Sequence, residues 1–118
     1  MFSSPIPTLG YLFEIGKRKI AISGDQNLSD MAFTELANNA DLVVMPMAIA
    51  EETGRVARNL HATPSQIGSA AKRMHAKQLV ISHLMQRSLR DLDSNLSLIR
   101  KRYQGRLTVA EDRLCIYL

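Results

Sequence analysis

Two short stretches decide the fold of this chain: IAISGD at residues 20–25 and QLVISH at residues 78–83. Each contains an apolar run with the length of a buried strand, and each ends on a polar side chain, Asp25 or His83. The stretch DLVVM at residues 41–45 has the same apolar character, which is typical of a strand buried on both faces. In an open α/β sheet the carboxyl ends of the strands meet at one crevice, so we expect Asp25 and His83 to lie close together.

Helix starts and strand pairs account for most of the remaining chain. Thr63-Pro64-Ser65-Gln66 combines an N-cap, a proline at the first helical position and a capping-box glutamine. Residues 46–62 contain a proline, a glycine and two adjacent glutamates, and we expect a long loop there. The predicted strands are 9–15, 19–23, 41–45, 78–82, 107–110 and 114–118. The predicted helices run from Ser29 or Asp30 to about Asn39, from Thr63 to about His75, and from Asp93 or Ser94 to about Gly105. This order, β-β-α-β-α-β-α-β-β, is an α/β fold with a hairpin at each end.

The composition is that of one globular domain, with 118 residues of which 46% are hydrophobic and 22% charged. The chain has no apolar run of about 18 residues, and residues 1–7 lack the basic and apolar regions of a secretory signal. We therefore expect a cytoplasmic protein without a membrane segment. The single cysteine, Cys115, is expected to be a small buried apolar residue in the last strand.

The net charge of +4 permits binding to anionic substrates, including nucleic acid, but the basic residues are scattered along the chain. Scattered charges of this kind are typical of a solvated surface. With three Phe, three Tyr and no Trp, an aromatic platform for stacking single-stranded nucleic acid is not expected.

Asp25, His61 and His83 are the residues that could carry chemistry. Aspartate and histidine at strand ends are the ligand types of a zinc, manganese or iron site. His61 comes just before the helix start at Thr63, where it could bind a metal or transfer a proton. Each residue also has a structural alternative: Asp25 as a turn residue, His83 as a structural histidine and His61 as a loop residue without a role. His75, at a helix end beside two cations, is expected to be structural.

Taken together, six segments resemble the C-terminal half of metallo-β-lactamase-fold hydrolases. The resemblance is to the ribonuclease Z, arylsulfatase and phosphodiesterase-like branch, and it covers residues 10–118, leaving 1–9 as an N-terminal extension or truncation edge. It implies one lobe of an αββα sandwich. The segments are GYLFE at 10–14, ISGD at 22–25, ADLVV at 40–44, HATP at 61–64, LVISH at 79–83 with Arg87, and VAED at 109–112.

The resemblance also implies a role for each candidate residue. Asp25 matches the carboxylate that bridges two divalent metal ions, zinc first with manganese or iron as alternatives. His83 matches a terminal metal ligand, and His61 matches the histidine that protonates the leaving group. In such a site a bridging hydroxide attacks a phosphodiester or a related ester. The implied substrates are small esters or phosphodiesters, with RNA among them.

This sequence departs from the family in one decisive respect, because the ligand signature His-x-His-x-Asp-His is nowhere in it. Gln26 replaces a common threonine, and Pro46 stands where many members have Glu or His. One hypothesis is therefore an incomplete hydrolase that is inactive alone. A second is a non-enzymatic binding or assembly module derived from one. A third, an unrelated nucleotide-binding α/β domain, ranks last because no phosphate-binding loop is present.

We expect the chain to form homo-oligomers or to associate with a missing N-terminal half. The strands at 41–45 and 78–82 do not alternate polar with apolar residues, which is typical of strands buried on both faces, while helices can cover only one face of the sheet. An uncovered sheet face would exceed the apolar patch that monomers usually tolerate.

Overall fold

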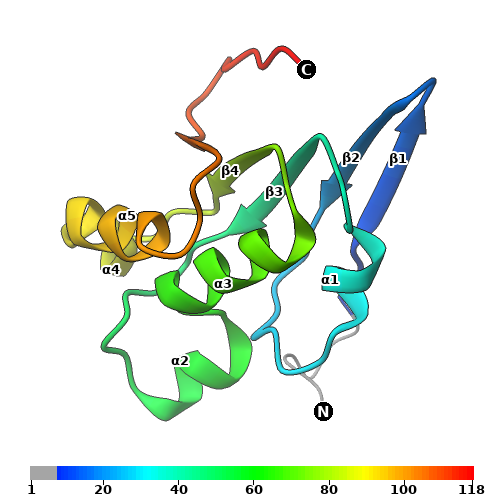
Figure 1. Cartoon of the computed structure of the whole chain (residues 1–118). Coiled ribbons are helices and arrows are strands. Elements are labelled where there is room, and N and C mark those ends of the chain that lie inside the picture. Colours follow the sequence, from blue (N-terminus) through cyan, green and yellow to red (C-terminus); the bar gives the residue numbers. More distant parts are fainter. Residues whose placement is uncertain (1–7) are drawn as a thin grey trace.

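The computed structural model describes residues 8–118 and contains a single sheet with helices on one side (Figure 1). The elements in chain order are β1 (Tyr11–Ile15), β2 (Arg18–Ile22), α1 (Ala32–Leu36), β3 (Leu42–Pro46), α2 (Arg55–Leu60), α3 (Pro64–Met74), β4 (Gln78–Ser82), α4 (Gln86–Arg90), α5 (Leu92–Arg100) and β5 (Arg106–Val109). Within residues 8–118, no helix combines the length and apolar character needed to cross a membrane.

The sheet has the strand order β1-β2-β3-β4-β5. β1 and β2 form an antiparallel hairpin, whereas β2, β3, β4 and β5 run parallel. Parallel neighbours need a crossover connection, and the segments carrying α1, α3 and α5 supply one between each successive pair. The carboxyl ends of β2, β3 and β4 therefore lie at the same edge of the sheet, as the sequence predicts.

The hydrophobic core lies between the sheet and its helices. Val43, Met45, Leu79 and Ile81 are fully or almost fully buried there. The predicted capping box of α3 is confirmed: Thr63 Oγ1 accepts from Gln66 N, and Gln66 Oε1 accepts from Thr63 N at 2.8 Å. α3 also packs tightly on α5, because a Cβ added at Gly68 would lie 2.8 Å from the Ile99 carbonyl oxygen.

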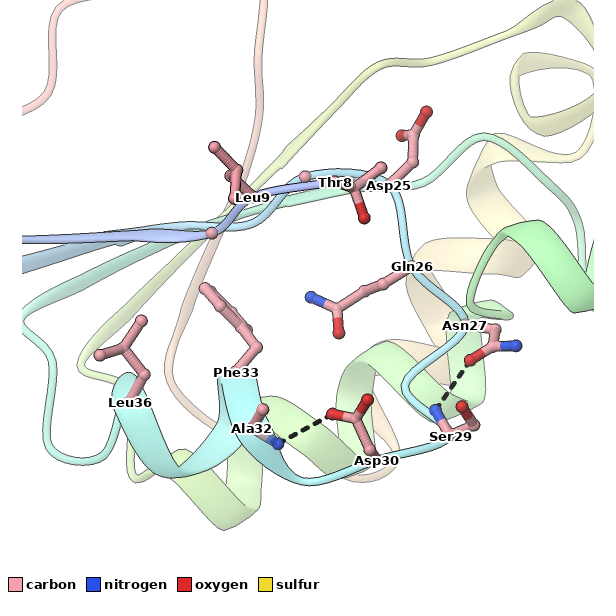
Figure 2. Close-up of a pocket in the computed structure, with 12 residues that line it drawn as sticks. Thr8, Leu9, Asp25, Gln26, Asn27, Ser29, Asp30, Ala32, Phe33 and Leu36 are labelled. Atoms are coloured by element: carbon pink, nitrogen blue, oxygen red, sulfur yellow. Dashed lines mark hydrogen bonds between the residues drawn. The ribbon is translucent and has the colours of Figure 1, made fainter. Parts of the chain in front are cut away.

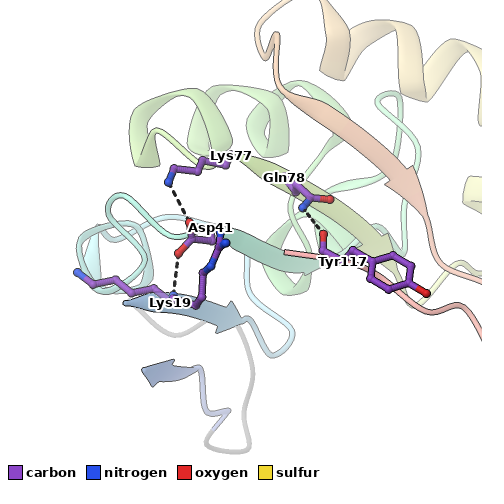
Figure 3. A network of polar contacts seen from close by, with 6 residues as sticks. Lys19, Asp41, Lys77, Gln78 and Tyr117 are labelled. Atoms are coloured by element: carbon purple, nitrogen blue, oxygen red, sulfur yellow. Dashed lines mark hydrogen bonds and ion pairs between the residues drawn. The ribbon is translucent and has the colours of Figure 1, made fainter. Parts of the chain in front are cut away.

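Asp41 ties the amino ends of three strands together (Figure 3). Its carboxylate accepts from the Lys19 backbone N–H at 2.8 Å and from Lys77 Nζ at 2.9 Å, while the Asp41 backbone N–H donates to the Lys19 carbonyl. Lys19 belongs to β2, Asp41 immediately precedes β3, and Lys77 immediately precedes β4. The N–H of Lys19 first, and then Lys77, hold the pKa of Asp41 below its ordinary value.

The structure corrects the predicted order of elements in the interior of the chain. Residues 46–62 are not all loop, because α2 forms within them, and its apolar residues Val56 and Leu60 are one helical turn apart. The first predicted helix shortens to Ala32–Leu36, and the Asp30 side chain, whose Oδ1 accepts from Ala32 N, lies just before it. The predicted helix that begins at Asp93 or Ser94 is preceded by α4 and becomes α5, Leu92–Arg100.

The predicted strand at 114–118 is wrong, and with it the C-terminal hairpin. After β5 and a turn in which Leu114 N donates to the Glu111 carbonyl, these residues join no strand ladder. The segment is instead held by a side chain, as Gln78 Nε2 donates to the Tyr117 carbonyl at 2.8 Å (Figure 3). Cys115 is consequently exposed rather than buried. Of the prediction for residues 1–9, residues 1–7 lie outside the described part of the chain.

The sheet face opposite the helices carries exposed apolar side chains. The strand register aligns Tyr11 with Ile22 and Phe13 with Ile20, which places these residues on one face. Tyr11, Phe13, Ile15 and Ile22 are 50%, 47%, 63% and 38% exposed, and the Tyr11 and Phe13 rings stack at 6.2 Å. Helices thus leave this face open on β1 and β2, but the predicted open face of the strands at 41–45 and 78–82 is wrong in part, because Leu42 and Val80, which share this face, are buried.

Asp41 makes the stability of the fold depend on pH. Its pKa in the folded chain is below the ordinary value of 3.8, so ionised Asp41 stabilises the fold above that pH, and the contribution is lost as the pH falls through the folded-state pKa. We expect Asp41→Asn to lower the free energy of unfolding at about pH 7, and the difference from the unmodified chain to shrink at about pH 3. Urea unfolding followed by circular dichroism measures both values. A deficit of equal size at both pH values would contradict the assignment, and Asp112→Asn, an exposed carboxyl, is the control.

Candidate active site

Three loops at one edge of the sheet deliver Asp25, His61 and His83. Asp25 follows β2 after Ser23 and Gly24, and His83 is the first residue after β4. His61 is the C-cap of α2 and stands two residues before the N-cap of α3. His83 has a positive φ of 52°, which turns the chain sharply away from the strand.

Gly24 allows this edge to form. A Cβ added at Gly24 would lie 2.7 Å from the Leu9 carbonyl oxygen, so any other residue would force the backbone before β1 away from the end of β2. Ser23 is buried beside it, and its Oγ donates to the Gly24 carbonyl at 2.7 Å. Gln26 Nε2 in turn donates to Ser23 Oγ at 2.5 Å, which fixes the turn around Asp25.

The three candidate side chains converge, as the sequence predicts. His83 Nε2 lies 3.6 Å and His61 Nδ1 lies 3.9 Å from Asp25 Oδ1. The two imidazole ring centres are 6.0 Å apart. The Asp25 and His83 side chains are 43% and 46% exposed, whereas His61 is only 13% exposed. Asp25 therefore stands between an accessible imidazole and a largely buried one.

The pKa of His61 lies below the ordinary value of an imidazole. Burial lowers its pKa first, and the charges of His83 and Arg87 lower it further, while Asp25 opposes them. Its Nδ1 is buried and has no hydrogen-bond partner among the described residues. Buried polar atoms normally have partners, so a site that leaves this nitrogen open toward Asp25 has room for a further group.

The spacing of the donors distinguishes the two histidines. Two ligands about 2.0–2.2 Å from one tetrahedral zinc ion lie about 3.3–3.6 Å apart. The 3.6 Å between Asp25 and His83 is within this range, whereas the 3.9 Å between Asp25 and His61 is longer. Within residues 8–118, no group of three or more His, Cys, Asp or Glu side chains is arranged to hold a metal ion. The chemistry of Asp25 and His83 thus fits part of a metal site, for which further ligands are required.

A hollow of about 350 Å³ lies beside Asp25 (Figure 2). Phe33, Leu36 and Leu9 form its apolar part, and Gln26 points into it, whereas the Asp25 carboxylate points away from Phe33. The polar groups nearby mostly serve local turns, since Asn27 Oδ1 accepts from Ser29 N and Asp30 Oδ1 from Ala32 N.

Sequence reasoning missed the contribution of residues 50–60 to this edge. Glu51 fixes the start of α3 by accepting from Ser65 N at 2.8 Å and from Ser65 Oγ at 2.6 Å. α2 places Arg55 near His61, where both residues line a second hollow. The apolar pair Val56 and Leu60, four residues apart, was the signal that could have revealed this helix.

Comparison with known proteins agrees with this architecture. A family profile described as a beta-lactamase superfamily domain matches residues 2–84, which is more than half of the 118 residues. The chain belongs to the beta-lactamase superfamily. This confirms the resemblance to metallo-β-lactamase-fold proteins on which the site residues were predicted.

Ribonuclease Z sequences are among the relatives of this superfamily member. The chain is 42% identical to ribonuclease Z of Bacillus velezensis over 71 residues, which are 59% of this chain and 23% of the relative. It is 31% identical to ribonuclease Z of Myxococcus xanthus over 102 residues, which are 86% of this chain and 33% of the relative. The chain thus spans about a quarter to a third of the length of these relatives.

Solved structures show the same fold. Human tRNase Z, short form, aligns with a TM-score of 0.68 at 27% identity, covering 92% of this chain and 37% of that chain. The metallo-beta-lactamase fold protein YhfI from Bacillus subtilis aligns with a TM-score of 0.70 at 20% identity, covering 81% of this chain and 38% of that chain. The five-stranded sheet with its helices is therefore part of a metallo-β-lactamase fold.

Gly24 offers a test of how this edge is built. We expect Gly24→Ala to lower the free energy of unfolding by about 1–3 kcal/mol, because the new methyl group meets a backbone oxygen that cannot move alone. Gly54→Ala is the matched control, since a Cβ there meets nothing within 4 Å. Chemical denaturation of both variants measures the effect, and equal stability of the two would show that the contact with Leu9 does not constrain the edge.

Proposed function

We propose that this chain is the C-terminal lobe, residues 10–118, of a cytoplasmic metal-dependent hydrolase that cleaves phosphodiester or related ester bonds. The observation that carries the proposal is the convergence of Asp25, His61 and His83 at the carboxyl edge of the sheet. The ribonuclease Z relatives favour RNA as the substrate class. We further propose that the lobe is inactive alone.

Asp25 and His83 would hold the metal ions, for which zinc is the first candidate and manganese or iron the alternatives. The two oxygens of Asp25 suit a carboxylate shared by two cations. His83 Nε2 lies 3.6 Å from Asp25 Oδ1, which is the distance between two ligands of one ion. When bound, two such ions supply a nucleophile at neutral pH and stabilise the charge that develops on the phosphoryl oxygens. The remaining ligands would come from an N-terminal lobe carrying the signature His-x-His-x-Asp-His, which this sequence lacks.

His61 would donate a proton to the leaving-group oxygen. It lies farther from Asp25 than His83 does, and it is less exposed than His83. Its lowered pKa makes the protonated ring a stronger acid, and the negative charge of an approaching phosphodiester favours protonation. The charge of Asp25 partly offsets this lowering of the His61 pKa. The same carboxylate would therefore hold metal ions and support protonation of His61.

The exposed sheet face would pack against the second lobe or another copy of the chain. Tyr11, Phe13, Ile15 and Ile22 form an apolar patch that a β-sandwich would bury between its sheets. This patch also favours the alternative of a non-enzymatic binding or assembly module, which would use the face without any metal. Metal binding at Asp25 and His83 is expected of the hydrolase and not of the binding module. The hydrolase hypothesis also requires a His-x-His-x-Asp-His signature in the coding sequence upstream.

Manganese binding tests the proposed metal site directly. We expect Mn²⁺ to broaden the amide NMR signals of residues around Asp25 and His83 and to leave those around His75 unaffected, because a paramagnetic ion acts only on nearby nuclei. His83→Asn should abolish this local broadening, and His75→Asn should retain it. The two substitutions are matched, since His75 and His83 have left-handed φ values of 54° and 52°, which asparagine accepts.

Other results would contradict either the metal site or the need for a second lobe. Broadening that centres on Glu51 and Glu52, or that survives His83→Asn, would place the ion elsewhere. Two tightly bound metals per isolated chain by elemental analysis, or robust phosphodiesterase activity that Asp25→Ala removes, would show that no second lobe is needed.

The exposed sheet face predicts association in solution. We expect light scattering to report dimers or larger species, and a dye that binds apolar surfaces to fluoresce with dilute protein, because the patch around Phe13 is uncovered. Phe13→Lys should shift the population toward monomer, whereas Leu89→Lys, an equally exposed apolar position on α4, should not. A stable monomer that binds no dye would show that the chain closes its own core.

A further inference from the structure

A second hollow, of about 500 Å³, opens between α2 and the start of α4. His61 forms part of its wall, so this hollow and the proposed catalytic residue are in direct contact. It is separate from the hollow beside Asp25, with which it shares no lining residue. The side chains that matter are Arg55, Val56, Ala57, Leu60, His61 and Arg87.

The two hollows have opposite charge. The described residues that line the first include the carboxylates of Asp25 and Asp30 and no Lys or Arg. Those that line the second include Arg55 and Arg87 and no Asp or Glu. A phosphate group is therefore repelled from the first hollow and attracted to the second, where planar guanidinium groups can donate paired hydrogen bonds to its oxygens.

The rest of the second hollow is apolar. Val56 is 76% exposed, and α2 contains no buried residue, so the apolar side of this short helix is left open. An apolar wall beside two guanidinium groups suits a molecule with a flat apolar part and an anionic part. A nucleotide has both parts within one unit.

We propose that this hollow binds one nucleotide unit of the substrate strand, with its phosphate on Arg55 and Arg87 and its base against Val56 and Leu60. The proposal rests on the proposed function and adds the substrate's path: the strand approaches Asp25 from the α2 side and passes His61. Arg55 and Arg87 are positioning residues, which bring the neighbouring phosphodiester within reach of the imidazole. The charge of Arg87 acts on His61, which agrees with their sharing one environment.

Binding of adenosine 5′-monophosphate to the full chain tests the proposal. Isothermal titration calorimetry in a buffer with a metal chelator should show binding, and Arg55→Ala and Arg87→Ala should each weaken it about tenfold or more, because each loses a charge-assisted hydrogen bond. Arg100→Ala, an exposed arginine in the last turn of α5, is the matched control and should bind like the unmodified chain. Val56→Asp should also weaken binding, because it places a charge where the base would lie. Inorganic phosphate, which has no base, should bind less tightly than the nucleotide.

Chemical shifts of the backbone amides locate the ligand. We expect changes at residues 54–61 and 86–88. Three results would overturn the proposal: arginine variants that bind as tightly as the unmodified chain, an affinity for adenosine equal to that for the nucleotide, or shifts confined to the Asp25 hollow. The chelator makes the nucleotide titration independent of metal, and Mn²⁺ binding is measured separately without it. No nucleotide binding, together with Mn²⁺ binding at His83, would reject this subsite and leave the hydrolase proposal standing. Nucleotide binding without Mn²⁺ binding would reject the metal site alone.

Discussion

The parallel alignment of β2, β3 and β4 is the constraint on which the rest of this structure depends. Parallel strands start at one edge of a sheet and end at the other, and Asp41 fastens the starting edge through Lys19 and Lys77. With that edge aligned, the residues that follow β2 and β4 must emerge together at the opposite edge. Asp25 and His83 are neighbours for this reason, although 57 residues lie between them in the sequence.

The carboxyl edge gains its chemical character from differences in burial. Asp25 and His83 are accessible, while His61 is withdrawn beneath them with an unpaired Nδ1 among the described residues. Burial favours neutral imidazole at His61, and the nearby carboxylate opposes this effect. Under the proposed function, a group that can take up and release a proton lies beside two candidate metal-ligand donors, a combination suited to ester cleavage. In that proposal Asp25 and His83 supply only part of a binuclear site.

The two faces of the sheet differ in how far they are covered. On one face, Val43, Met45, Leu79 and Ile81 are buried by helices, whereas on the other face Tyr11, Phe13 and Ile22 remain exposed on β1 and β2. The C-terminal segment returns only as far as β4, where Gln78 binds the Tyr117 carbonyl. The chain covers 37–38% of the two structural neighbours, and the proposed lobe of a sandwich would bury the exposed apolar residues of β1 and β2.

Local signals in the sequence determined β1 to β5 and the start of α3, and they placed Asp25, His61 and His83 at one edge of the sheet. The apolar runs at 41–45 and 78–82 had few alternatives to buried strands, and the capping box at Thr63 depends only on residues within one turn. The convergence of Asp25 and His83 followed from the parallel topology. Tertiary structure alone decided that Leu114–Leu118, which has the composition of a strand, joins no strand ladder and is held instead by Gln78 through the Tyr117 carbonyl, so that Cys115 is exposed. It also decided that α2 forms and brings Arg55 beside His61, because a six-residue helix is too short to be stable without its surroundings.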